Sequence, residues 1–386
     1  MRLTQMIAVS RAPIAAFAAM GVLWGTYAAV FPDLKTMLGV GEARLGQLIL
    51  GTPLAAVLSM LAAPAFGAAL GRVALPIAAT LMALAFALPG QAASLVLFPV
   101  AMMACGAATG MTDVLMNARV AQIENDRGVS LMNLCHAAYS FGYAGGAIGT
   151  GVLRGMGWGP DWVMGTMAAV AVLFVLQTWE KDGQISGLRK PADARSSALG
   201  WVPVFGGGVV LIAFLTENAA ENWSALHIEK TLGGSPEEGA LGPAALALTM
   251  AIARLGGQGL IARVNPFRLL MGGAALSATG ALGAAMATSP TMAYAGFIVM
   301  GIGSSVIAPT AFSLVGRLST PEARARSVAR ATLLGYFGYF FGPPSLGFIA
   351  GAFGLRFAFV FAAAMLLVVF LLAPLMASAS KRAAQA

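Results

Sequence analysis

The chain has 386 residues, of which 59% are hydrophobic and only 10% are charged, and its mean hydropathy is +0.82. A soluble protein carries charges at about 25% of its positions, so this composition excludes a water-soluble globular protein. The net charge of +8 would suggest a nucleic-acid partner in a soluble protein. Here basic loops on the cytoplasmic side of a membrane explain it, and we expect no nucleic-acid partner.

Apolar runs of spanning length follow one another along the whole chain, since a helix needs about 20 residues to cross the bilayer. The runs are continuous rather than alternating, which favours helices over a β-barrel. We predict twelve transmembrane helices at residues 12–32, 43–68, 73–90, 95–118, 131–153, 162–178, 201–227, 241–262, 269–288, 291–316, 328–350 and 356–376. The first run could also be a signal peptide, but a second run begins after only a short polar loop.

The central polar stretch, residues 180–200, predicts a cytoplasmic linker between an N-terminal half, residues 1–179, and a C-terminal half, residues 201–386. Seventeen of the 23 Lys and Arg residues fall in the predicted inner segments and five in the outer ones. This bias predicts an inner-membrane protein with both termini in the cytoplasm. Cys105 and Cys135 lie within apolar runs and read as small buried thiols rather than as a disulfide.

The two halves repeat at an offset of 196 residues. Phe141-Gly142-Tyr143 with Gly146 recurs as Phe337-Gly338-Tyr339 with Gly342, and Arg72, Gly155 and Leu45-Gly46 recur as Arg268, Gly351 and Leu241-Gly242. One such match is weak in a glycine-rich chain, but a shared offset at equivalent helices is not. The repeat predicts an all-α fold of two pseudo-symmetric six-helix halves with a site between them. We interpret the repeated glycines as positions of close helix packing.

These features together resemble the major facilitator superfamily over essentially the whole chain. Two segments are similar to a bacterial branch near the fucose permeases and the membrane proteins of rhizopine gene clusters: Asp113-Val114-x-Met116-Asn117-Ala118 with Glu124, Arg127, Met132 and His136-x-x-Tyr139-Ser140-x-Gly142, and Glu217-x-x-x-Glu221-x-Trp223-Ser224 with Leu232-Gly233. The resemblance implies alternating access to a cavity lined by helices one, four, seven and ten. It also implies a sugar, polyol or related solute, carried by proton symport.

The superfamily's loop signature between helices two and three is reduced here to Gly67, Gly71 and Arg72. Its counterpart in the second half reads Ala253-Arg254-Leu255-Gly256-Gly257-Gln258, with Gln in place of the expected acid. The resemblance therefore implies gating roles for Arg72 and Arg254, in latches that lack their acidic partners. For Arg254 we predict a gate or a packing partner, and the alternative is a substrate ligand.

Few ionisable residues fall inside the predicted helices, and each costs about 2.5–3.5 kcal/mol on insertion scales. Glu217 and Glu221 lie one turn apart in the predicted outer half of helix seven, beside the parallel pair Asn218 and Asn222. Two neighbouring carboxylates do not both ionise cheaply at low dielectric, so we predict proton coupling or solute contact. The alternative is a hydrated helix end at which both acids face water.

A second group of polar residues lies in the predicted inner parts of helices four and five. Asp113 and Asn117 are one turn apart, as are Asn133 and His136. Since the two helices follow each other closely, we expect one polar cluster that can hold or pass a proton. The alternative is a structural contact between the two helices. None of these acids is repeated in the other half.

Aromatic residues near the predicted outer ends of helices one and seven, Trp24, Tyr27 and Trp223, are candidates for stacking on a sugar ring. The alternative is interfacial or lipid-facing packing. No metal-ligand spacing, phosphate loop or catalytic pair stands out, so we expect no cofactor, no metal and no enzyme.

We therefore predict a monomeric secondary transporter whose partners are a small polar solute, protons and the lipid bilayer. An exporter of amphipathic compounds would suit the many Met and Ala residues of the helices. A sensor that keeps the transporter fold but moves nothing is the other alternative.

Overall fold

The computed structural model describes residues 3–129, 131–185, 200–256, 264–319 and 323–383, and it is helical almost throughout these ranges. The first half contains α1 (Leu3–Val9), α2 (Arg11–Leu38), α3 (Glu42–Leu48), α4 (Gly51–Leu70), α5 (Ala74–Phe86), α6 (Leu97–Arg127), α7 (Met132–Gly155) and α8 (Pro160–Val175), with single turns η1 (Gly71–Val73), η2 (Pro89–Gln91) and η3 (Leu176–Thr178). The second half contains α9 (Val202–Thr231), α10 (Pro236–Gly256), α12 (Pro266–Met286), α13 (Pro290–Leu318), α14 (Arg324–Phe353) and α15 (Leu355–Ala383).

Nine segments of the described residues are long and apolar enough to cross a membrane, and one of them, Glu42–Gln91, contains both α4 and α5. α7 and α14 have 24 and 30 residues, and at about 1.5 Å per residue they also reach across a bilayer. The prediction of an all-helical membrane protein with twelve spans is therefore confirmed.

Several helices differ from their predicted extents, and two of these differences affect the description of the cavity. The predicted span 43–68 is divided into α3 and α4. At the break, backbone hydrogen bonds join residues three apart instead of four, such as that from Thr52 N to Ile49 O at 3.1 Å. Pro53 follows the break and supplies no N–H for a regular helical bond. In addition, α6 continues to Arg127, nine residues past its predicted end at Ala118.

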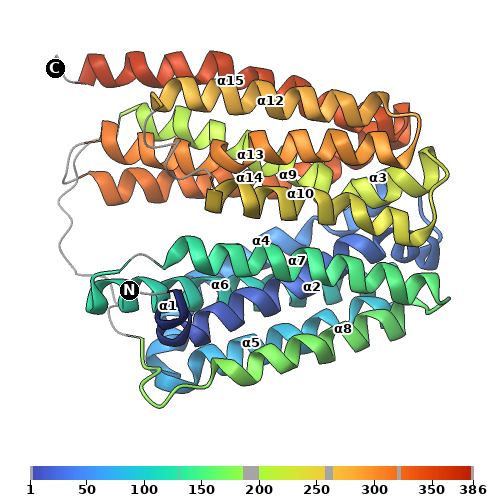
Figure 1. The fold of residues 1–386 in the computed structure, drawn as a ribbon, viewed down its shortest axis with the longest axis horizontal. Coiled ribbons are helices and arrows are strands. Elements are labelled where there is room, and N and C mark those ends of the chain that lie inside the picture. Colours follow the sequence, from blue (N-terminus) through green and yellow to red (C-terminus); the bar gives the residue numbers. More distant parts are fainter. Residues whose placement is uncertain (1–2, 130, 186–199, 257–263, 320–322, 384–386) are drawn as a thin grey trace.

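Figure 1 shows α2 and α5–α8 on one side of the molecule and α9, α10 and α12–α15 on the other, with α3 of the first half lying against α14. The start of α1 and the end of α15 lie at the same end, which we call the inner end after the predicted orientation; the opposite end, where α3 lies, we call the outer end. Crossing helices alternate in direction, so the last residues of α2, α7 and α9 are at the outer end, and the last residues of α6 are at the inner end.

The repeat is visible in helix packing. A Cβ atom added to Gly142 of α7 would meet the carbonyl oxygen of Ala18 in α2. A Cβ added to Gly338, the repeat-related residue of α14, would meet the carbonyl oxygen of Leu211 in α9. The glycines thus let α7 approach α2 as closely as α14 approaches α9, which is how small residues favour helix packing in lipid.

The two halves touch near the outer end. Five alanines of α2, α7 and α10 form a buried cluster there: Ala29, Ala144, Ala147, Ala240 and Ala244. Gly46 of α3 also approaches α14 closely, since a Cβ atom at this position would meet the carbonyl oxygen of Pro343. Small side chains on both sides of this boundary allow the backbones to come together and close the outer end.

Candidate functional site

A cavity of about 400 Å³ lies between the two halves. Its walls come from α2, α4, α6 and α7 of the first half and from α9, α10 and α14 of the second. Ten of the residues predicted from sequence line it: Trp24, Tyr27, Asp113, Asn117, His136, Glu217, Asn218, Glu221, Asn222 and Arg254. The first, fourth and seventh spanning helices contribute as expected, but the tenth, α13, contributes none of the described lining residues.

Glu217 and Glu221 lie in the cavity wall one turn apart on α9. Glu217 is 6% exposed, and its Oε1 has no hydrogen-bond partner among the described residues. Asn218 Oδ1 beside it is likewise buried and unpartnered within the described chain. The predicted position in the outer half of helix seven was wrong for Glu217, because α9 runs from Val202 to Thr231 and places this residue at its middle. The alternative of a hydrated helix end does not fit this buried residue.

Asp113 lies near the middle of α6, and Asn117 Nδ2 donates to its Oδ1 at 3.0 Å and to its carbonyl oxygen at 2.8 Å. His136 lines the same cavity from α7, but its ring packs edge-on against Phe17, with centroids 4.8 Å apart. No hydrogen bond joins Asp113 to His136, both of which are described. Asn133 is exposed and outside the cavity wall, so the predicted four-residue cluster was wrong in that member.

The two polar groups predicted at different depths share one cavity. Because α6 extends to Arg127, Asp113 is at mid-helix rather than near its inner end, and Glu217 is at the middle of α9. Acids from both halves therefore face the same space. This arrangement can hold a solute and a proton at the same time, with each half contributing at least one carboxyl group.

Two predicted residues are not in the cavity wall. Trp223 is completely buried in the protein and packs against Phe31, with ring centroids 5.5 Å apart. Its place is therefore that of a core residue between α9 and α2 rather than of a stacking platform. Arg72 is exposed in η1, away from the cavity.

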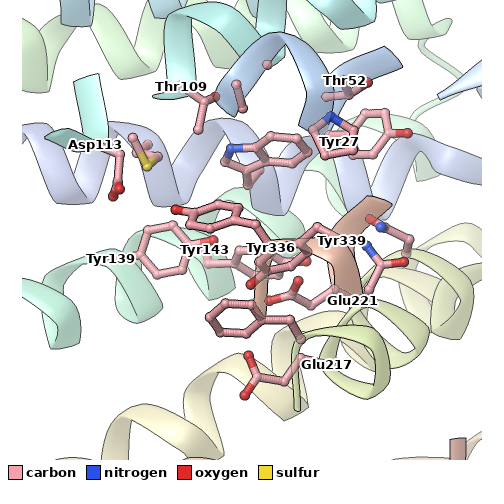
Figure 2. A pocket seen from close by; sticks show the side chains of 18 of the residues that line it. Tyr27, Thr52, Thr109, Asp113, Tyr139, Tyr143, Glu217, Glu221, Tyr336 and Tyr339 are labelled. Atoms are coloured by element: carbon pink, nitrogen blue, oxygen red, sulfur yellow. The ribbon is translucent and has the colours of Figure 1, made fainter. Parts of the chain in front are cut away.

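Four tyrosines that sequence reasoning did not propose as site residues line the cavity: Tyr139 and Tyr143 of α7, and Tyr336 and Tyr339 of α14. Figure 2 shows these rings grouped together, with Glu221 and Glu217 beside them and Asp113 apart on α6. The rings of Tyr336 and Tyr339 are 6.1 Å apart and those of Tyr139 and Tyr143 are 6.0 Å apart. The repeat could have identified them, since Tyr143 and Tyr339 are separated by its 196-residue offset.

Arg254 of α10 is the cationic side chain in the described wall of the cavity. Its Nε approaches the carbonyl oxygen of Ser305 at 3.5 Å, and it forms no ion pair with Asp113, Glu217 or Glu221, all of which are described. Gly257 and Gln258 of the same predicted latch segment lie outside the described residues.

The outer end carries a charged network that the sequence did not predict. The Arg154 side chain of α7 is 1% exposed and forms ion pairs with Asp33 of α2 and Glu229 of α9, at 2.6 and 2.7 Å. It also donates to the carbonyl oxygens of Ala29, at 2.8 Å, and Pro236, at 3.4 Å. Glu229 and Pro236 belong to the second half, so this guanidinium ties the two halves together above the cavity.

Comparisons with known proteins agree with this architecture. Residues 208–385 match the family model described as Major Facilitator Superfamily. An uncharacterised MFS-type transporter of Yersinia pestis is 30% identical over 357 residues, which are 92% of this chain and 92% of that protein. Among solved structures, an inward-facing, occupied bacterial homologue of the human lysosomal transporter Spinster has a TM-score of 0.78 at 16% identity, over 96% of this chain and 97% of that one.

A D-xylose–proton symporter is also similar in fold, with a TM-score of 0.70 and 14% identity over 93% of this chain and 96% of that one. The solved structures show the fold, whereas the identity to the Yersinia pestis protein over nearly the whole of both chains shows the family. This chain therefore belongs to the major facilitator superfamily of membrane transporters.

Proposed function

We propose that the protein is a secondary active transporter that moves a small polar solute across the bacterial inner membrane by alternating access. The observation that carries this proposal is the cavity between the halves, whose wall holds carboxyl groups from both of them. Buried acids in a spanning protein are costly, and they mark solute or proton pathways.

The outer end supports alternating access as the mechanism. Arg154 pairs with Asp33 of its own half and with Glu229 of the other, so opening the outer end breaks or rearranges these ion pairs. We propose that the two halves, residues 1–179 and 201–386, rock about the cavity and that residues 180–200 link them in the cytoplasm. With both termini also cytoplasmic, the described state is closed to the outside.

We further propose that transport is coupled to protons by symport. Glu217 has an unpartnered, buried Oε1, and Asp113 is held by Asn117 alone among its described side-chain contacts. A carboxyl group in such surroundings is cheaper to carry across as the neutral acid, and it therefore binds a proton before the halves move. The D-xylose–proton symporter, which is similar in fold, uses this class of solute and ion.

The test is uptake of labelled sugars and polyols into proteoliposomes, with and without an imposed pH gradient. Glu217→Gln and Asp113→Asn are expected to abolish gradient-driven accumulation, and the variant at the proton site should retain solute exchange. Asp126→Asn removes the same charge from an exposed position at the inner end of α6 and should leave transport unchanged. Full accumulation in both amide variants contradicts the coupling. Solutes that bind without flux would identify a sensor instead.

A further inference from the structure

The charges that line the cavity do not balance. Three carboxyl groups, those of Asp113, Glu217 and Glu221, face one guanidinium, that of Arg254. Buried charges are costly unless they are paired and hydrogen-bonded. The cavity therefore favours a ligand that brings positive charge over one that is neutral or anionic.

Arg254 does not neutralise the acids in this structure. It has no ion pair within 4.0 Å with any of the three described carboxyl groups, and its hydrogen bond to the Ser305 carbonyl oxygen is long, at 3.5 Å. Arg154 shows what a paired buried arginine looks like in the same chain, with contacts of 2.6 and 2.7 Å to two acids. The protein can thus pair a buried arginine closely. In the cavity it does not, so the carboxylates there can form an ion pair with a ligand.

Two of the unpartnered atoms in the described wall can only accept hydrogen bonds. Glu217 Oε1 and Asn218 Oδ1 are buried without a hydrogen bond from any described residue. They are neighbours on α9, and both side chains belong to the cavity wall. A buried acceptor left without a donor is destabilising, so a ligand that donates several hydrogen bonds at this point fits best. An ammonium group has three donors and no acceptor.

Aromatic faces lie next to these acceptors. Tyr339 and Phe214 stack with ring centroids 4.7 Å apart, and Figure 2 shows Tyr339 and Tyr143 in the group of rings beside Glu221. Ring faces attract a cation more strongly when water is excluded. Carboxylates and ring faces together form a site for an organic cation.

Hydroxyl groups occupy another part of the wall. Tyr27, Thr52 and Thr109 line the cavity, and their hydroxyl oxygens are buried without a described partner. A hydroxyl group both donates and accepts, so these side chains complement the hydroxyl groups of a ligand rather than its charge. The wall thus has Glu217 and Glu221 on α9, and it has three unpartnered hydroxyl groups on α2, α4 and α6, where Asp113 also lies.

We propose that the solute carried in this cavity is a small hydroxylated molecule that bears a protonated amine, as an amino sugar does. The ammonium group donates to the ionised Glu217 and to Asn218 and lies against the tyrosine rings, while the hydroxyl groups of the solute bond to Tyr27, Thr52 and Thr109. The symported proton is then carried by Asp113 rather than by Glu217. This inference rests on the proposed function, because it takes the cavity to be the transport site. The inference assigns a positive charge to the solute, whereas the fold alone does not determine the charge.

Binding to the purified full chain tests the proposal with pairs of solutes that differ only in an amine or a hydroxyl group. The pairs are glucosamine and glucose, galactosamine and galactose, mannosamine and mannose, and an aminodeoxyinositol and inositol, measured by calorimetry at pH 7. We expect at least one amine to bind about tenfold or more tightly than its hydroxyl partner. Equal or tighter binding of the neutral partners, or no binding by any amine, overturns the proposal.

Three variants keep the result independent of folding. Glu217→Gln should reduce the preference for the amine to less than threefold, whereas Asp126→Asn should preserve it. Arg254→Met removes the opposing positive charge and should tighten amine binding, a gain that misfolding cannot produce. Weaker amine binding in an Arg254→Met variant with unchanged helix content would overturn the proposal.

Flux measurements separate this inference from the proposed function. Amines that bind but never cross a proteoliposome membrane would leave the assigned ligand class intact and contradict transport. Gradient-driven flux of a neutral polyol, with amines excluded, would support transport and overturn the assigned class.

Discussion

Arg154 and Glu229 join the two halves of the protein at the outer end, with 2.7 Å between Nη1 of the guanidinium and Oε1 of the carboxylate. Arg154 comes from the fifth spanning helix and Glu229 from the seventh, so a pair that is broken can be remade only when the halves return to this arrangement. Removing one partner of a buried pair costs about 3–5 kcal/mol because the other charge stays buried and unpaired. The closed outer end therefore depends on a contact that single substitutions can test.

Glu229→Gln is expected to open the outer end. The neutral amide weakens the tie to Arg154, and the population shifts toward outward-open forms. The measurement is labelling of Thr52→Cys, a cavity position, by a membrane-impermeant maleimide added from outside, in a background with Cys105→Ser and Cys135→Ser. We expect labelling to be several-fold faster in the Glu229→Gln variant.

Glu42→Gln is the matched control for this experiment. Glu42 also pairs with a cation at the outer end, Lys35, but both residues belong to the first half. Its substitution removes one outer ion pair without removing a tie between the halves, so labelling of Thr52→Cys should stay unchanged. Equal acceleration in both variants would mean that loss of outer charge, rather than of the inter-half contact, opens the cavity.

Gly46→Ala should open the same end by a different route. A methyl group at Gly46 of α3 meets the carbonyl oxygen of Pro343 in α14, so the halves have to separate there. Alanine favours a helix over glycine by about 1 kcal/mol, so α3 itself is not weakened. Faster outside labelling with unchanged helix content is expected. Gly41→Ala, with no atom near the added methyl group, serves as the control, and equal rates in the two variants would contradict the close-approach argument.

Arg119 and Glu180 provide a test of how the inner end is held. Arg119 Nε donates to Glu180 Oε2 at 2.9 Å, and the Arg119 side chain is only 7% exposed. The pair fastens the start of the segment 180–200 to α6. Arg119→Met should lower stability by about 2 kcal/mol, less than for a fully buried pair because Glu180 is near the surface. Thermal unfolding of the single variants, Arg119→Met and Glu180→Gln, and of the double variant measures the coupling between them.

In the double variant of that pair, neither charge is left buried alone, so part of the loss should be recovered. Losses that simply add would show that the two side chains contribute independently and that the segment is held by other contacts. Arg11 is one such contact, since its Nη2 donates to the carbonyl oxygen of Trp179 at 2.8 Å.

The helices themselves could be predicted because lipid imposes length and hydropathy on each span, and those constraints act locally along the chain. The ends of the helices could be predicted less closely. The predicted fourth helix stopped at Ala118, where the apolar run ends, but α6 continues to Arg127 because a helix remains favourable beyond the hydrocarbon. That error of nine residues placed Asp113 near the inner end rather than at mid-helix, and so separated it from Glu217.

Contacts between the halves were not predictable from one sequence. Asp33, Arg154 and Glu229 each lie near a helix end, where an ionisable residue is usually hydrated, and only the docking of the halves buries the guanidinium. Trp223 was also placed wrongly. It lies on a cavity-lining helix, but its side chain packs in the core and not in the cavity wall. The direction in which a side chain points depends on the rotation of its helix, which hydropathy alone does not determine.

Two of the cavity tyrosines could have been predicted from the internal repeat, although not from the composition. Tyr143 and Tyr339 are related by the repeat offset of 196 residues, and both line the cavity from equivalent helices of the two halves. Acids are not repeated, whereas this aromatic pair is. The two rings are related by the repeat, whereas the charged residues are not. This arrangement fits a solute that contacts both halves and whose charge is recognised mainly by one half.

Tyr339→Phe and Tyr339→Ala should therefore differ in ligand binding. The ring of Tyr339 stacks on Phe214 at 4.7 Å and lies in the cavity wall, so phenylalanine keeps the aromatic face and alanine removes it. An aromatic face next to a desolvated cation is worth up to about 2 kcal/mol, so alanine should weaken binding of the amine solute by roughly tenfold or more. Phenylalanine should change the affinity by less than about threefold. Calorimetry on the purified variants measures both, and Tyr294→Ala, at the outer end beside Glu238, should bind as the unaltered protein does. Equal losses in the phenylalanine and alanine variants would show that the hydroxyl group, not the ring, contacts the solute.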